Sequence, residues 1–210
     1  MVMAMTVRSV RKAKGHGAER RQEILDAALM LFAQRGIQAV STRDIAAATG
    51  ISQPALYAYF RTRDEITAVL CEQAFLDLRT RILAAADHQL PTRASFMSMC
   101  QVYIDFGLQQ PDAYRVAFML EKGGSEPQET KARVIAAGVE TFECFHGQVT
   151  RFVAAGLTRP GEAVLLSQSL WAGLHGLVSL LIARPGFPWA DHQVLISRHI
   201  AALADGVLLR

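Results

Sequence analysis

Apolar residues recur at intervals of three and four along almost the whole chain, the spacing that places them on one face of an α-helix. Ile24, Ala28 and Leu31 mark the first such face, in a segment that Gly36 ends. No strand-like alternation of useful length interrupts the pattern. The spacing, with its proline and glycine breaks, predicts an all-α chain with later helices over residues 63–87, 93–109, 112–121, 129–155, 162–183 and 190–209.

Residues 41–60 combine two short helical stretches with a glycine between them. Ser41 or Thr42 suits the N-cap of the first stretch, because a short hydroxyl side chain accepts bonds from the free N–H groups of the first turn. Gly50 ends that stretch, since glycine tolerates a left-handed backbone. Ser52 then suits the N-cap of the second stretch. The pattern predicts a helix-turn-helix, whose second helix enters the DNA major groove.

The second helix of this pair is predicted to present polar and aromatic side chains to DNA. Leu56 and Phe60 point into the domain, and Pro54 suits the first turn because its missing N–H has no partner there. The side chains left on the outer or flanking surface are Gln53, Pro54, Ala55, Tyr57 and Tyr59.

Two segments, Arg20–Gly36 and Thr42–Ile66, resemble the N-terminal part of the TetR family of transcriptional regulators. The second follows the family signature closely, with LYAYF followed by Arg63 and two acids, although the family usually has lysine in place of Arg63. The resemblance implies a DNA-binding head of three helices and a body of six. Its expected domains are a basic arm over 1–17, the head over 18–78 and a sensing and dimerisation body over 79–210.

The resemblance also implies which residues contact DNA. Phosphate contacts are expected from Thr42, Tyr57, Tyr59 and Arg63, and these set the register. Arg43, Gln53 and Ala55 are the base-reading candidates, because arginine can bind guanine, glutamine can bind adenine, and an alanine methyl can pack on thymine. The competing interpretations are a solvated surface charge for Arg43 and core packing for Tyr57. The complete predicted DNA-binding set is Thr42, Arg43, Ser52, Gln53, Pro54, Ala55, Tyr57, Tyr59 and Arg63.

The charge distribution supports a DNA-binding head. Residues 1–65 hold ten Lys/Arg and six Asp/Glu, a net charge of +4, whereas the remaining residues hold twelve and thirteen, a net charge of −1. Positive charge therefore concentrates where phosphate would bind. The first 17 residues are basic and lack apolar periodicity, which is consistent with a disordered leader or with an arm that adds DNA contacts.

Composition argues against several other classes. The three cysteines are far apart and form no CxxC pair, so no metal site or disulfide framework is expected, and a reduced cytoplasmic location fits. No cofactor motif appears. The apolar stretch 164–183 contains Gln168, His175 and three serines, and we interpret it as a buried helix rather than a membrane span.

A ligand cavity and a dimer interface follow from the resemblance. A small apolar or amphipathic ligand is expected among aromatic, methionine and histidine side chains of the body, although ordinary core packing explains each residue singly. The predicted lining residues are Phe96, Met99, Tyr103, Phe106, Phe118, Phe142, His146, Phe152, Trp171 and His175. The predicted homodimer interface consists of Gly173, Leu174, Leu177, Leu181, Ile200, Leu203 and Val207. Residues 169–181 also resemble a sub-group with a Trp–x3–His–Gly signature.

These observations predict a ligand-responsive repressor that binds a palindromic operator as a dimer, with the helix over 63–87 carrying movement between body and head. A regulator of the same class without a small-molecule effector is the first alternative. An enzyme is the second, but Cys144 and His146 are two residues apart on a helix and face different directions. No phosphate loop or nucleophile elbow appears either.

Overall fold

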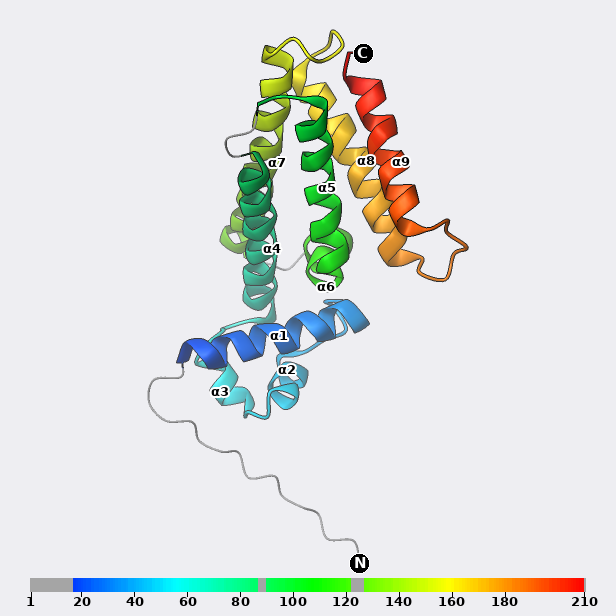
Figure 1. The fold of residues 1–210 in the computed structure, drawn as a ribbon. Helices are drawn as coiled ribbons and strands as arrows, with labels where there is room; N and C mark the ends of the chain where they lie inside the picture. The colour runs from blue at the N-terminus through cyan, green and yellow to red at the C-terminus, as the bar shows by residue number, and fades with distance from the viewer. Residues whose placement is uncertain (1–16, 87–89, 122–126, 210) are drawn as a thin grey trace, which may run out of the picture.

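The computed structural model describes residues 17–86, 90–121 and 127–209, and the predicted arm lies almost entirely outside this part. The described chain is helical, as predicted, and forms a small head below a longer body (Figure 1). The head contains α1 (Gly17–Arg35), α2 (Thr42–Ala48) and α3 (Gln53–Tyr57). The body contains α4 (Arg63–Ala86), α5 (Arg93–Gln109), α6 (Pro111–Tyr114), η1 (Arg115–Met119), α7 (Gln128–Ala154), α8 (Ala163–Ala183) and α9 (His192–Val207).

The local signals of the head act as predicted. Ser41 is the N-cap of α2 and forms a capping box with Asp44, whose pKa is lowered by the hydrogen bonds from Ser41. Gly50 has a φ of 65°, the left-handed conformation that the sharp turn after α2 requires. The Ser52 hydroxyl accepts a bond from the backbone N–H of Ala55 at the start of α3. Capping residues therefore fix both ends of the turn.

Two buried side chains hold α3 against α1 and α2. Leu56 and Phe60 are both fully buried, as the sequence pattern predicts. The guanidinium of Arg21 on α1 lies 4.6 Å from the centre of the Phe60 ring, a cation–π contact. Phe60, just beyond the end of α3, is thereby held against α1, and the polar side of α3 remains open.

Residues 111–119 differ from the single short helix predicted over 112–121. Here α6 gives way to a π-helical turn, η1, in which the backbone N–H of Leu120 donates to the carbonyl of Arg115. The Arg115 guanidinium donates to the carbonyl of Ile182 on α8, 2.9 Å away. The pair α6–η1 contacts α1, α4 and α5. This segment therefore joins the head to the core of the body, alongside α4.

One side of helix α8 packs against the other helices of the body. It is the one helix in the described ranges that is long and apolar enough to cross a membrane by length and composition alone. It contacts α5, α7 and α9. Its approach to α5 is close at Gly107, where an added Cβ would lie 2.4 Å from a methyl group of Val178. The core between these helices leaves no room for a side chain at position 107.

Candidate functional site

Three polar side chains converge on the outer face of the head. The Gln53 amide nitrogen donates to the Thr42 hydroxyl and to the Tyr57 hydroxyl, both at 3.0 Å. The two hydroxyls are themselves 3.3 Å apart. We call Thr42, Gln53 and Tyr57 the head cluster. It links the first residue of α2 to both ends of α3, so the predicted DNA-contacting side chains are held in one arrangement before DNA binds.

The remaining predicted contacts of the head fall into two groups. Arg43, Pro54 and Ala55 are exposed beside the head cluster, where a DNA groove can reach them. Tyr57 is also exposed, with 47% of its surface accessible, so it is not a core residue. Ser52 uses its hydroxyl as a helix cap.

Tyr59 and Arg63 are partly committed to contacts inside the protein. Tyr59 follows the end of α3, is half-buried and packs against the core. The Arg63 guanidinium contacts the Asp64 carboxylate at 3.3 Å and the side-chain oxygen of Gln38 at 3.2 Å. Arg63 thus fastens the loop between α1 and α2 to the start of α4. Its role as a phosphate contact stays a prediction.

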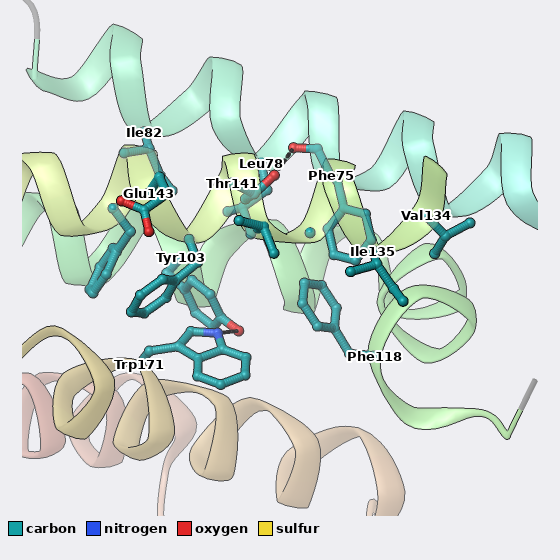
Figure 2. Close-up of a pocket in the computed structure, with 14 residues that line it drawn as sticks. Phe75, Leu78, Ile82, Tyr103, Phe118, Val134, Ile135, Thr141, Glu143 and Trp171 are labelled. Atoms are coloured by element: carbon teal, nitrogen blue, oxygen red, sulfur yellow. Dashed lines mark hydrogen bonds between the residues drawn. The ribbon is translucent and has the colours of Figure 1, made fainter. Parts of the chain in front are cut away.

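The body contains a cavity of about 510 Å³ between α4, α5, α7 and α8 (Figure 2). Its walls are mainly apolar. Ile135 and Val139 on α7 line it and are more than half exposed, so the cavity opens to solvent beside this helix. Figure 2 shows Tyr103 and Trp171 pointing toward one another on its α5 and α8 side. The lining residues are Phe75, Leu78, Ile82, Tyr103, Phe118, Val134, Ile135, Gly138, Val139, Thr141, Phe142, Glu143, Phe145 and Trp171.

The cavity brings together some of the residues predicted to line it and not others. Tyr103, Phe118, Phe142 and Trp171 line it. The prediction is corrected for the others, Phe96, Met99, Phe106, His146, Phe152 and His175, which are not in its wall. Most of these are ordinary core.

The excluded residues have identifiable partners. The rings of Phe96 and Phe152 pack edge to face, 5.4 Å apart. The His146 ring bonds the Ser167 hydroxyl at 3.0 Å. Sequence reasoning missed the cavity wall formed by α4 and by the first half of α7. The sequence does indicate the α7 part of this wall. Ile135, Val139 and Phe142 are apolar residues at helical spacing, and they lie on a side of α7 that other helices do not fully cover.

A chain of polar groups lies behind Trp171. The Trp171 indole N–H donates to the Tyr103 hydroxyl at 3.1 Å, and that hydroxyl is 3.2 Å from the Tyr114 hydroxyl. Tyr114 is 2.6 Å from Nδ1 of His175, whose Nε2 is 3.2 Å from the Ser179 hydroxyl. We call these five residues the relay. Burial lowers the pKa of His175 and raises the pKa of Tyr103 to about 12, so the relay is uncharged at neutral pH.

Most side chains of the predicted dimer interface are buried within one protomer. Leu174 and Ile200 are at most 2% exposed, and a Cβ added at Gly173 would contact Leu203 of the same chain. These side chains hold α8 against its own neighbours. Leu177, Leu181 and Val207 are likewise buried in the protomer, and their contact with a partner stays a prediction.

Another face of α8 remains open. It carries Leu165, Ser169, Ala172, Gly176, Leu180 and Ala183 at spacings of three and four. Leu165 and Leu180 are 59% and 52% exposed, and nothing lies within 4 Å of a Cβ added at Gly176. We call this the open α8 face. Its small central residues permit another helix to approach closely.

Comparison with known proteins places both parts of the chain in one family. Residues 24–70 match the bacterial regulatory proteins of the tetR family, and residues 96–203 match a tetracyclin repressor-like C-terminal domain. The second description names no sub-group, so the Trp–x3–His–Gly resemblance stays a prediction.

Individual proteins agree with the family matches. The chain is 31% identical over 159 residues to the nucleoid occlusion factor SlmA of Haemophilus influenzae, covering 73% of this chain and 69% of that protein. Identity to SlmA of Pasteurella multocida is 33% over 121 residues, 55% of this chain and only 58% of that relative. A tetR-family regulatory protein of Rhodococcus RHA1 shares the fold, with a TM-score of 0.78 at 19% identity over 91% of this chain and 98% of that one. The chain therefore belongs to the TetR family of DNA-binding regulators.

Proposed function

We propose that this regulator binds a palindromic operator as a homodimer and releases it when a small, mainly apolar ligand occupies the body cavity. The head cluster is the observation that carries the DNA-binding part. Two hydroxyl groups, of Thr42 and Tyr57, are held side by side on an exposed surface by Gln53. One of these hydroxyls donates to the other across their 3.3 Å contact, and the second keeps its O–H free to donate to a phosphate oxygen. Exposed Arg43 and Ala55 lie beside them as the proposed base readers.

Removing one hydroxyl tests the DNA contact. Tyr57→Phe is expected to weaken operator binding about threefold to tenfold, the effect of losing one or two hydrogen bonds in the dimer. The measurement is a fluorescence anisotropy titration at fixed salt, with an operator selected from a random DNA pool. The far-ultraviolet circular dichroism should not change, because Tyr57 is exposed and outside the core. Equal affinity of the variant and the original protein would count against Tyr57 as a phosphate contact.

Salt dependence tests the electrostatic part of the same proposal. Each phosphate neutralised by a lysine or arginine releases a counterion, so a plot of log affinity against log salt has a slope of about −0.9 per contact. A dimer whose two heads carry the basic residues of this chain is expected to give a slope of about −4 or steeper. A slope near zero between 50 and 200 mM salt would contradict phosphate binding by these heads.

Ligand control requires two forms of the dimer that differ in the spacing of their heads. The ligand shifts the population toward the non-binding form only as far as its affinities for the two forms differ. Two connections support such coupling. Helix α4 lines the cavity with Phe75 and Leu78 and leads directly into the head. The α6–η1 segment contributes Phe118 to the cavity and also contacts α1.

A regulator without a small-molecule effector is the second candidate. The similar SlmA proteins favour it, because their name, nucleoid occlusion factor, mentions no small-molecule ligand. The open cavity favours the ligand-responsive form. Operator titrations with and without a saturating cavity ligand separate the two, because only the first candidate predicts a lower affinity with ligand.

A further inference from the structure

Within the described part of the chain, no cationic side chain lines the cavity. Among its lining residues Glu143 alone is charged, and it is an exposed acid at the opening. A ligand with a carboxylate or phosphate would have to leave its charge without a counterion in an apolar wall, which costs several kcal/mol. The lining therefore disfavours anionic ligands. It also disfavours cationic ligands, because Glu143 is exposed, and an exposed ion pair repays little of the cost of removing a charge from water.

The cavity wall has one buried polar anchor, the Tyr103 hydroxyl. Tyr103 is 1% exposed and comes from α5, opposite α7. The other lining hydroxyl, of Thr141, already donates to the carbonyl of Ala137 at 2.8 Å and lies 3.2 Å from that of Phe75. Tyr103 instead belongs to the relay, whose hydrogen atoms can be arranged in two ways.

In the first arrangement the relay donates inward. Trp171 donates to Tyr103, Tyr103 to Tyr114, Tyr114 to Nδ1 of His175, and Nε2 of His175 to Ser179, as the distances between these atoms permit. The Tyr103 oxygen then has one free lone pair. It can accept a hydrogen bond from a ligand hydroxyl.

In the second arrangement the relay donates outward. The other neutral tautomer of His175 carries its proton on Nδ1 and donates to Tyr114, which donates to Tyr103. The Tyr103 O–H is then free to donate to a ligand carbonyl, while Trp171 still donates to the Tyr103 oxygen. No group gains or loses charge between the two arrangements. The same anchor thus suits an alcohol or a ketone.

We propose that the cavity binds a neutral, mainly apolar molecule that carries one hydroxyl or carbonyl group, which bonds Tyr103. This inference rests on the proposed ligand cavity and specifies the chemistry of its occupant. The relay supplies the hydrogen bond, and the apolar walls from α4 and α7 cover the rest of the molecule. Trp171, 37% exposed beside the anchor, also serves as an optical reporter of occupancy.

The test compares four probes with one apolar body: 1-decanol, 2-decanone, decanoate and decylammonium. Binding is followed by Trp171 fluorescence in a Trp189→Phe background, which removes the second of the two tryptophans. The alcohol and the ketone are expected to bind at least tenfold more tightly than either charged probe. A charged probe that binds as tightly as 1-decanol, or the failure of all four to bind, overturns the inference.

Two variants test which residues cause the preference for neutral probes. Tyr103→Phe is expected to weaken 1-decanol and 2-decanone about threefold to tenfold, because it removes the anchor and keeps the ring. Glu143→Lys changes an exposed residue and leaves the core intact, so it tests the charge argument even if Tyr103→Phe unfolds. It should strengthen decanoate severalfold and leave 1-decanol within twofold, and an unchanged decanoate affinity contradicts the charge argument.

Operator binding is measured on the same samples. If the protein binds operator but none of the four probes, this inference is wrong and the DNA-binding function is unaffected. Probe binding in the expected order without any change in operator affinity supports the ligand class and removes ligand control.

Discussion

Ala172→Arg is expected to prevent the proposed dimer from forming and to lower operator affinity by roughly a hundredfold or more, because two linked heads bind DNA far more tightly than one. Ala172 is exposed at the centre of the open α8 face, between Ser169 and Gly176. We propose that the helices of two protomers meet at this face, because its small residues permit a close approach, and an arginine there would place a long charged side chain between them. Light scattering at micromolar concentration and an operator titration measure the two effects.

The matched control is Ala132→Arg, which adds the same side chain at an exposed position of α7, away from the open α8 face. It should keep both the dimer and the operator affinity. A dimeric Ala172→Arg variant would show that another surface forms the interface. A monomeric variant with full operator affinity would instead contradict binding as a dimer.

Gly107→Ala is expected to reduce the free energy of unfolding by about 3 kcal/mol, at the upper end of typical overpacking costs. The added Cβ would lie 2.4 Å from Val178 Cγ1 and 3.0 Å from the Tyr114 ring. Val178 is on α8 and is fully buried, so the helix itself must move. Urea unfolding followed by circular dichroism measures the change.

Gly147→Ala provides the control for helix propensity. Gly147 lies within α7, and an added Cβ there meets nothing within 4 Å. The substitution should stabilise the protein by roughly 0.5–1 kcal/mol, since alanine favours a helix over glycine. Equal effects of the two substitutions would show that α5 and α8 can separate at no cost. Because Gly107 also contacts Tyr114, its alanine variant should in addition disturb the relay.

Local chemistry made the head predictable from the sequence. Ser41, Ser52 and Gly50 act within four residues of themselves, so their roles follow from residue type and spacing. The all-α class follows in the same way from helical periodicity. Contacts between residues far apart in the sequence could not be predicted in this way. Arg63 is an example, because nothing near it in the sequence indicates its contact with Gln38.

Helix α8 explains why the interface and the cavity were harder to predict. It is apolar on nearly every side, so hydrophobicity ranks Leu174 and Leu177 above Ala172 and Gly176, although the leucines are buried in the protomer. Which side faces a partner depends on where α5 and α9 lie. The cavity wall from α4 was missed for the same reason. The sequence pattern of a buried residue such as Leu78 is the same whether its side chain packs against a neighbour or lines a cavity.

The head cluster has a consequence for redesigning the specificity of this regulator. Gln53 is the natural choice for changing an adenine preference, but its amide nitrogen already orients Thr42 and Tyr57. Replacing it would free both hydroxyls to rotate. Binding to any DNA sequence would then have to fix the Thr42 and Tyr57 side chains, at an entropic cost. Variation at Gln53 thus changes affinity for all operators together. Arg43 and Ala55 are the proposed base readers and hold no such partners in place, so we expect substitutions there to exchange one operator for another.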